Sequence, residues 1–452
     1  MNLTNTHTLV VGLGVTGVAL AKFLKKNGAS VTVTDISGEA ALGPRLAAVR
    51  EMDIRLELGG HRPESFKQAE LIVLSPGVPH TLGVIESARA KGVPVLGEIE
   101  LASRFIREPL VAITGTNGKT TTTALLGEML KKSGLRVFVG GNIGTPLISY
   151  LEGAQKADVI VAEISSFQLD TSEHFKPKVA VLLNITQDHL DRYADFNAYI
   201  RSKGLIFKNQ QEDDVAILNG ADPHIRSLSS GIRSRQLFFN HHKNAGTEPV
   251  EGAVIDSREI VLLTKESGRH SLPVDGIHLL GRHNLENVAA ASLAALAAGG
   301  NFAGINATAN EFRGLPHRLE HIVTRKEVRY FNDSKSTTPD SVVRALEAFS
   351  ERIVLIMGGR DKGSDFGLLK EPANRQVKHL VVLGEAKDKI RSALDRQVPI
   401  STADTMATAV FEAARAAAPG DVVLLSPGCT SFDMYQNYAE RGRDFSEQAK
   451  KL

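Results

Sequence analysis

Residues 110–121 read LVAITGTNGKTT, an apolar run that leads through a glycine-punctuated turn to Lys119 and Thr120. The run 110–114 predicts a buried strand, and apolar residues at 125, 126, 129 and 130 predict one face of a following helix. Glycines let backbone N–H groups close around phosphate oxygens, and the amino end of a helix adds a favourable dipole. Strand, turn and helix together predict the phosphate-binding unit of an α/β fold.

Lys119 and Thr120 give this turn its expected chemistry. Lys119 is expected against the β- and γ-phosphates of ATP, and the Thr120 hydroxyl on a magnesium ion. Only two residues separate Gly115 from Gly118, so the loop is a shortened variant of the usual pattern. The alternative is an ordinary strand-to-helix turn, but a cation at a helix N-terminus is unfavourable without an anion nearby. The predicted ATP-binding residues of this loop are Gly115, Thr116, Asn117, Gly118, Lys119, Thr120 and Thr121.

Glu163 interrupts the otherwise apolar run at residues 159–164. A buried, unpaired carboxylate is costly, so this side chain needs a cation or a network of hydrogen bonds. Magnesium beside the nucleotide is the natural partner. The alternative is an acid at a strand end that faces water.

Outward from this loop, short β-branched runs alternate with amphipathic stretches, which predicts parallel sheets built from βαβ units. Strand-like runs occur at residues 8–11, 31–35, 71–75, 93–96, 110–114, 159–164, 179–184, 215–218, 353–357, 380–383 and 422–425. We predict three consecutive α/β domains. They are a Rossmann-like domain at 1–97, a central P-loop domain at 98–313 and a Rossmann-like domain at 314–452. Residues 230–275 are less regular, and no topology is predicted for them.

Composition narrows the class of protein. The 452 residues are 42% hydrophobic and 23% charged, and the formal net charge of +2 gives no basis for nucleic-acid binding. The single cysteine, Cys429, excludes an internal disulfide and fits a reducing compartment. Because we find neither a secretory signal nor the roughly 18-residue apolar run of a membrane helix, we expect a cytoplasmic protein without a transmembrane segment.

A second glycine-rich turn, Gly12-Leu-Gly14-Val-Thr-Gly17, follows the first strand, and Asp35 ends the next one. This is a dinucleotide-binding pattern in its proper context. Taken alone it favours an NAD-dependent enzyme. However, the loop binds a pyrophosphate and the acid binds a polar group, so a nucleotide-diphosphate sugar satisfies the same pattern.

Further segments resemble the Mur ligase family, whose members add amino acids to the peptidoglycan precursor. The shortened phosphate loop is itself typical of that family, and the resemblance runs in order from about residue 9 to residue 443. The other matching segments are GGNIG at 140–144, EISSFQL at 163–169, NITQDHLDRY at 184–193, HNLEN at 283–287, PHRLE at 316–320, NDSKSTT at 332–338, GGRDKG at 358–363 and LSPGCTSFD at 425–433.

The resemblance implies a set of ligands for each group. Further ATP-binding residues would be Asn284, Asn287, Arg318 and Asp333. The UDP-linked substrate would contact Val15, Thr16, Asp35, Ser37, Ser75 and Asn142, and the amino acid would contact Lys335, Thr337, Lys362, Ser431 and Phe432. Two magnesium ions are expected, with Thr120, Glu163, His189 and Lys203 as ligands, and with Lys119, His189 and Lys203 as catalytic residues. Because an ammonium cannot ligate a metal, Lys203 would carry a carbamate formed from carbon dioxide.

Several of these residues also have plain structural interpretations. His189 lies in a segment that could cap a helix, and Lys203 by itself looks like an exposed helix lysine. Thr338-Pro339-Asp340 reads as a helix start, so part of the 333–340 segment is structural. Cys429 has no neighbour that suggests thiolate activation.

The function implied by the resemblance is ATP-dependent amide ligation. The expected substrates are UDP-N-acetylmuramoyl-L-alanine, D-glutamate and ATP, with an acyl phosphate as intermediate, and the enzyme is expected to be a monomer. One alternative is a ligase of the same family with a different amino acid, or with folate as acceptor. The others are an NAD(P)-dependent oxidoreductase and a non-catalytic, nucleotide-dependent scaffold.

Overall fold

The computed structural model describes residues 1–154, 156–188, 192–240 and 251–452. The chain forms two compact units, residues 1–276 with 286–310, and residues 277–285 with 311–452. Within the described residues, strands that are buried along most of their length alternate with helices, as the β-branched runs predict. In the same part of the chain, no helix combines the length and the apolar composition that crossing a bilayer requires.

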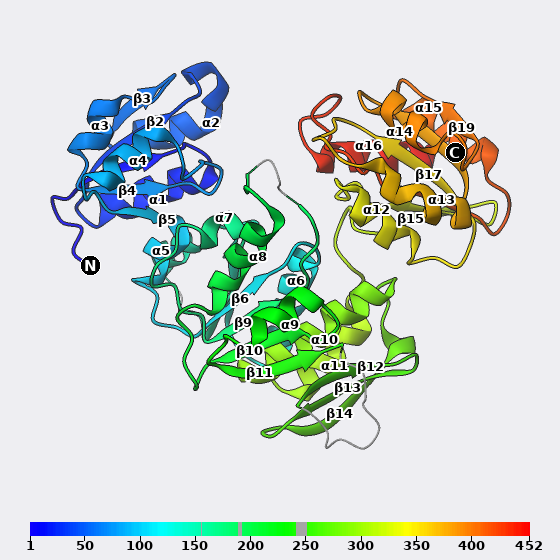
Figure 1. Ribbon diagram of the computed structural model, residues 1–452, viewed down its shortest axis with the longest axis horizontal. Helices are drawn as coiled ribbons and strands as arrows, with labels where there is room; N and C mark the ends of the chain where they lie inside the picture. The colour runs from blue at the N-terminus through cyan, green and yellow to red at the C-terminus, as the bar shows by residue number, and fades with distance from the viewer. Residues whose placement is uncertain (155, 189–191, 241–250) are drawn as a thin grey trace. The chain divides into compact units, whose positions relative to one another are not determined.

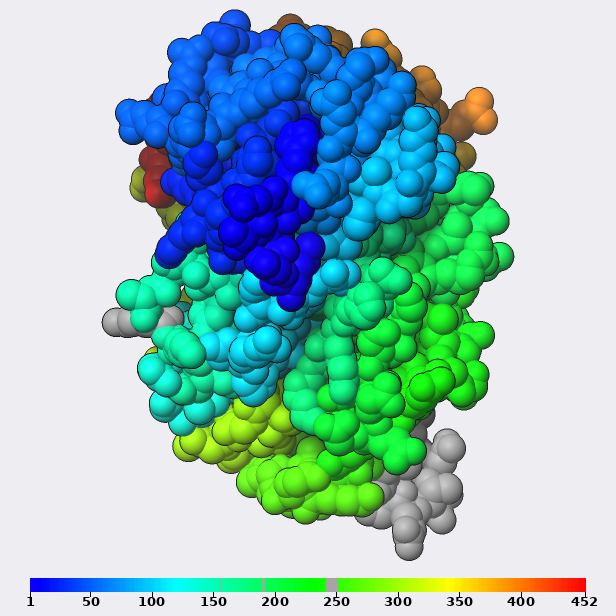
Figure 2. All heavy atoms as spheres, turned by 90° about the vertical axis from the view of Figure 1, so that its left-hand side faces the viewer, coloured from blue at the N-terminus to red at the C-terminus, as the bar shows by residue number. Residues whose placement is uncertain are grey.

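The first sheet is wholly parallel, with described strands in the order β3-β2-β1-β4-β5. Its elements are β1 His7–Val11, α1 Val15–Lys26, β2 Ser30–Asp35, α2 Glu39–Arg50, β3 Arg55–Leu58, α3 Pro63–Gln68, β4 Leu71–Leu74, α4 Gly83–Ala90 and β5 Val95–Gly97. The order reverses between β1 and β4, and such a switch point is where doubly wound sheets bind nucleotides. This part is blue in Figure 1 and forms one continuous surface in Figure 2.

The second sheet has the order β14-β13-β12-β11-β10-β9-β6-β8-β7 among the described residues. Its elements are α5 Glu98–Ser103, β6 Leu110–Thr114, α6 Lys119–Lys132, β7 Val137–Gly141, η1 Leu147–Glu152, β8 Val159–Glu163, α7 Ser166–Leu169, β9 Val179–Leu182, α8 Phe196–Gly204, η2 Leu205–Phe207, β10 Val215–Asn219, α9 Pro223–Ser229, β11 Arg235–Phe239, β12 Gly252–Ile255, β13 Glu259–Thr264, β14 Gly268–Pro273, η3 Val274–Gly276, α10 Arg282–Ala297 and α11 Phe302–Glu311. Strand β6 lies between β8 and β9, so the phosphate loop leaves the interior of the sheet.

The third sheet has the described order β15-β16-β20-β17-β18-β19 and is parallel except for the pair β15–β16. Its elements are β15 Glu320–Arg325, β16 Val328–Asn332, α12 Pro339–Leu346, β17 Ile353–Gly358, η4 Phe366–Leu369, α13 Lys370–Gln376, β18 Val377–Leu383, α14 Lys387–Leu394, β19 Ile400–Thr402, α15 Met406–Ala416, β20 Val422–Leu425 and α16 Tyr438–Lys451. Thr338 caps α12 in a capping box and Pro339 follows at the first helical position, as the sequence predicts.

The strands predicted from apolar runs are all present, and the α/β fold class is confirmed. The segment for which no topology was predicted contains β11, which extends the parallel sheet, and the antiparallel strands β12, β13 and β14. Only one residue of β14 is buried, so its sequence lacks the continuous apolar run by which the predicted strands were recognised. Strands β3, β7, β15, β16 and β19 also lie outside the predicted runs. The boundaries between three domains stay a prediction.

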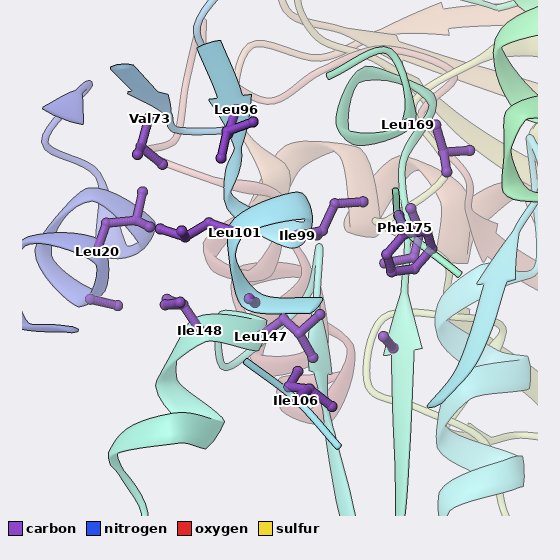
Figure 3. Close-up of a cluster of buried hydrophobic side chains, with 14 of the residues drawn as sticks. Leu20, Val73, Leu96, Ile99, Leu101, Ile106, Leu147, Ile148, Leu169 and Phe175 are labelled. Atoms are coloured by element: carbon purple, nitrogen blue, oxygen red, sulfur yellow. The ribbon is translucent and has the colours of Figure 1, made fainter. Parts of the chain in front are cut away.

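Buried side chains continue from α1 and β4 through α5 into the central sheet as one cluster (Figure 3). Two buried acids of α5 anchor it there. Glu98 accepts a hydrogen bond from the backbone N–H of Ile148 at 2.7 Å. Glu100 accepts from the backbone N–H groups of residues 173, 174 and 175 at 2.9–3.0 Å. Helix α5 is therefore tied to η1 and to the loop of residues 173–175 by hydrogen bonds as well as by apolar packing.

Candidate functional site

The phosphate loop joins β6 to α6, and its geometry explains its glycines. Gly118 has a φ of 85° and is the N-cap of α6. A Cβ at this position would lie 2.4 Å from Oδ1 of Asn287, so only glycine permits the close approach of that side chain. Asn287 Oδ1 also accepts a hydrogen bond from Thr122 Oγ1 at 3.2 Å. The predicted ATP residue Asn287 therefore lies against the loop.

Asn184 holds the loop from the neighbouring strand end. Its side-chain oxygen accepts from the Asn117 N–H at 2.8 Å, its amide nitrogen donates to the Asn117 carbonyl at 3.1 Å, and its own carbonyl accepts from the Thr116 N–H at 2.9 Å. No role was predicted for this residue from the sequence. The sequence did contain a signal for this residue, because an amide side chain follows the apolar strand β9 closely. The carboxyl ends of parallel strands meet at one edge of a sheet, which is the edge that carries the phosphate loop.

Two lysines converge on one carbonyl of the loop. Lys119 Nζ donates to the carbonyls of Gly115 and Thr116, both at 2.8 Å. Lys203 Nζ, from α8, donates to the Gly115 carbonyl at 2.9 Å. The loop therefore brings two lysine nitrogens together at the place where phosphate oxygens are expected.

The interpretation of Lys203 as an exposed helix lysine is wrong. The residue is 1% exposed, and its ammonium lies 4.6 Å from the centre of the Tyr199 ring. Burial, followed by the charge of Lys119, lowers the pKa of Lys203 well below its usual value, against the opposite effect of Asp188, Asp170 and Glu163. The fold thus makes the charged form of this amine less favourable than in a solvated lysine.

Glu163 ends β8 and is 2% exposed, so the alternative of an acid that faces water is wrong. Its Oε2 accepts from Thr120 Oγ1 at 2.8 Å and its Oε1 from Asn142 Nδ2 at 2.9 Å. A threonine hydroxyl and a carboxylate at this separation are suitable oxygen ligands for magnesium. Asn142, predicted for the UDP-linked substrate, therefore contacts a predicted metal ligand. His189 lies outside the described residues, and within them no three His, Cys, Asp or Glu side chains form a metal-binding group.

The N-terminal loop is built differently. Asp35 Oδ2 accepts from the Leu13 N–H at 2.6 Å, and its Oδ1 accepts from the Ser37 N–H at 2.7 Å. Ser75 Oγ donates to the Gly12 carbonyl at 2.8 Å. A Cβ on Gly17 would lie 1.9 Å from that same carbonyl, which explains the third glycine of the pattern. Asp35, Ser37 and Ser75 therefore shape the loop, while Val15 is 65% exposed beside it.

In the second unit, Asp333 follows β16 and is buried. It accepts hydrogen bonds from Ser426 Oγ at 2.9 Å and from the Leu319 N–H at 3.3 Å. Burial raises the pKa of Asp333 to about 7, although Ser426, the Leu319 N–H and the nearby Arg318 act in the opposite direction. The predicted ATP residues Arg318 and Asp333 are thus neighbours, whereas Asn284 donates to the Leu280 carbonyl at 2.7 Å.

The residues predicted for the amino acid lie on three loops of the third sheet. Lys335 places its ammonium 3.9 Å from the centre of the Tyr438 ring, and Thr337 is half-buried. Lys362 and Phe432 are exposed, and Ser431 is buried.

Arg441 of α16, for which no role was predicted from the sequence, links those three loops. This buried guanidinium donates to Ser334 Oγ and to the Ser334 carbonyl at 3.0 and 2.8 Å. It also donates to the Gly358 carbonyl at 3.3 Å and to the Cys429 carbonyl at 3.1 Å. Burial lowers the pKa of Arg441 to about 10. Three loops that carry predicted ligands are therefore held by one side chain.

Three family models match three successive segments of the chain, and each segment overlaps one of the three sheets. Residues 6–97 match "Mur ligase MurD-like, N-terminal domain", residues 113–295 match "Mur ligase middle domain", and residues 317–429 match "Mur ligase, glutamate ligase domain". Several relatives carry the name UDP-N-acetylmuramoylalanine–D-glutamate ligase, and two of them show the range of identity. The one from Desulfosudis oleivorans is 53% identical over 448 residues, which is 99% of this chain and 97% of the relative. The one from Geotalea daltonii is 44% identical over 452 residues, which is 100% of this chain and 99% of the relative.

Solved structures share the fold. The UDP-N-acetylmuramate-alanine ligase MurC from Thermotoga maritima matches with a TM-score of 0.61 at 21% identity, covering 99% of both chains. The MurF ligase from the same organism, in complex with ADP, matches with a TM-score of 0.62 at 16% identity, covering 100% of this chain and 98% of that one. At such identities the likeness extends to the three-domain fold alone.

Proposed function

The chain belongs to the Mur ligase family, and from this membership we propose that it is an ATP-dependent ligase that joins D-glutamate to UDP-N-acetylmuramoyl-L-alanine. The observation that carries the proposal is the full-length similarity to D-glutamate ligases at more than half identity. The phosphate loop supports the same conclusion, because the alternative of an NAD(P)-dependent oxidoreductase gives this loop no role.

The reaction needs ATP because an amide does not form spontaneously from a carboxylate and an amine in water. The γ-phosphoryl group passes to the carboxylate of the L-alanine residue, and this gives an acyl phosphate and ADP. The amine of D-glutamate then attacks the carbonyl carbon, the attacking nitrogen loses a proton, and phosphate leaves with one of the former carboxylate oxygens. Lys119 at the loop would neutralise charge on the transferring group.

The ATP-binding and metal-binding residues are assigned as part of the proposal. Thr120 and Glu163, whose oxygens lie 2.8 Å apart, would hold magnesium, and Asn142 orients the carboxylate through its other oxygen. When bound, magnesium supplies positive charge that stabilises the phosphoryl oxygens during transfer. The loop from Gly115 to Thr121, with Asn284, Asn287, Arg318 and Asp333, would bind ATP.

Lys203 is proposed to carry a carbamate. A neutral amine attacks carbon dioxide and releases one proton, and the product is an anion with two oxygens. Burial and the nearby Lys119 disfavour the ammonium form, and the same Lys119 charge would stabilise a carbamate. Together with His189, this anion would ligate a second magnesium ion.

D-Glutamate is proposed to bind in the second unit, at Lys335, Thr337, Lys362, Ser431 and Phe432. Two carboxylates of this substrate need cationic or hydroxyl partners, and this set offers two lysines and two hydroxyl groups. Arg441 would act as a positioning residue, since it holds the loops and need not touch the amino acid.

The test measures phosphate release and amide product with ATP, UDP-N-acetylmuramoyl-L-alanine and a panel of amino acids. D-Glutamate should support turnover, and L-glutamate, L-lysine and diaminopimelate should not. Turnover with a diamino acid instead of D-glutamate would overturn the substrate and keep the class. With an ¹⁸O-labelled L-alanine carboxylate, one label should appear in the released phosphate, and its absence would overturn the acyl phosphate.

A further inference from the structure

The loop after β3, residues 59–61, lies beside the loop that carries Asp35. The Gly59 N–H donates to the Ser37 carbonyl at 3.0 Å, and the Gly60 N–H donates to the Asp35 carbonyl at 3.2 Å. These contacts place His61 at the carboxyl edge of the first sheet, beyond β2 on the side of β3. None of the residues predicted for the UDP-linked substrate comes from this loop.

The fold indicates what should occupy this place. In a doubly wound sheet, the diphosphate lies at the amino end of α1, the acid that ends β2 faces the ribose, and the base extends further along the edge. Here β2 lies between β1 and β3, so further along the edge means the loop of residues 59–61. Ile36, which is 75% exposed, offers an apolar surface to a base at the same place.

The hydrogen bonds around His61 define which atom it presents. Thr34 Oγ1 lies 3.3 Å from the Gly60 carbonyl and 3.0 Å from His61 Nδ1. A threonine hydroxyl has one hydrogen, and a carbonyl can only accept, so both contacts form together only when Nδ1 carries a hydrogen and donates to Thr34. The ring nitrogen left over, Nε2, is then an acceptor.

The ring is also held in place. It packs edge-on against Phe66, with ring centroids 5.8 Å apart. Burial lowers the pKa of His61, although the nearby Asp35 carboxylate raises it, so the neutral imidazole is favoured at neutral pH. A fixed, neutral ring with a defined tautomer is suited to recognise a hydrogen-bond donor.

We propose that His61 Nε2 accepts a hydrogen bond from the uridine part of the UDP-linked substrate and helps to select that nucleoside. Uridine offers three such donors, the N3–H of uracil and the two ribose hydroxyls, and the N3–H is absent from cytosine. His61 is then a specificity residue of the first sheet, beside the diphosphate site. This inference rests on the proposed function.

The test compares His61→Phe and His61→Gln with a matched control, His7→Phe. His7 Nε2 lies 3.3 Å from Oγ1 of Thr32, which is on β2 like Thr34. His7 itself is at the end of β1 that is opposite the glycine loop. In His61→Phe, KM for UDP-N-acetylmuramoyl-L-alanine should rise about 3- to 10-fold, as expected for one lost hydrogen bond. Both kcat and the KM values for ATP and D-glutamate should stay unchanged. His61→Gln, whose amide oxygen can accept a bond, should recover most of the loss, and His7→Phe should show none.

The donor is identified with inhibitors that compete with the UDP-linked substrate. UDP is compared with its N3-methyl, 2′-deoxy and 3′-deoxy analogues. The wild-type enzyme should bind one analogue more weakly than UDP, and His61→Phe should lose that preference. An active wild-type enzyme with unchanged preferences in His61→Phe would overturn the inference alone. A rise of all three KM values together with a lower melting temperature would show a structural role instead. An inactive wild-type enzyme would overturn the proposed function.

Discussion

The two glycine loops share a local pattern and differ in what surrounds them. Each follows a parallel strand and opens a helix, at residues 12–17 and 115–118. The N-terminal loop is held by a carboxylate, because Asp35 accepts from the Leu13 N–H. The central loop is held by the amide of Asn184, and the side-chain nitrogens of Lys119 and Lys203 both donate to its Gly115 carbonyl. The local pattern thus indicates phosphate binding in both loops. The side chains that reach each loop from other segments determine the charge around it.

This difference separates binding from chemistry. The Lys119 ammonium suits the central loop to a polyphosphate whose charge changes during transfer. The N-terminal loop is held by the Asp35 carboxylate instead, so it suits the polar groups of a substrate that is held but does not react there. Substitutions at the central loop should therefore alter kcat or KM for ATP, and those at the N-terminal loop should alter the affinity for the UDP-linked substrate.

The largest effect is expected for Lys203→Ala. We expect turnover to fall at least about 1,000-fold, because the variant lacks the buried amine on which the carbamate forms. Lys208→Ala, an exposed lysine next to the same helix, is the control and should keep wild-type turnover. Steady-state phosphate release measures both. Full activity of Lys203→Ala, or unchanged wild-type activity after removal of carbon dioxide, would contradict the carbamate.

A smaller effect is expected for Gly17→Ala in the N-terminal loop. The new Cβ would lie 1.9 Å from the Gly12 carbonyl, so the loop or α1 must shift, at a cost of about 3 kcal/mol. Thermal unfolding should show a lower melting temperature, and KM for the UDP-linked substrate should rise. Gly14→Ala is the matched control for stability, because nothing lies within 4 Å of the place that its Cβ would take and its φ is −78°. Equal melting temperatures for the two variants would show that the close approach has no energetic role.

The smallest effect is expected when the carboxylate of Asp35 is replaced by an amide and the amide of Asn184 is replaced by a carboxylate. In Asp35→Asn, an amide NH2 would face the N–H of Leu13 or of Ser37. In Asn184→Asp, a carboxylate oxygen would face the Asn117 carbonyl. Each variant should lose about 1–2 kcal/mol of stability. KM should rise for the UDP-linked substrate in the first and for ATP in the second. The same KM affected in both variants would refute the division between the loops.

Much of the fold could be predicted because its signals are local. The run 110–114 is β6 residue for residue, and Thr338-Pro339 begins α12 as expected. Several strands escaped prediction, and β14 shows one reason, because it lies at an edge and buries only one residue. A continuous apolar run indicates a strand that is buried on both faces of its sheet. An edge strand of an antiparallel extension is not buried in this way, so its sequence contains no such run.

The candidate site divides along the same line. By itself the sequence determined the strands with continuous apolar runs, the start of α12 and the glycine turns, because these signals come from residues a few positions apart. Only the tertiary structure decided that Lys203 is buried on the phosphate loop, that Asn184 holds that loop, and that Arg441 joins three others. The physical reason is that desolvation and hydrogen-bond partners come from segments far apart in the chain. No short stretch of sequence contains them.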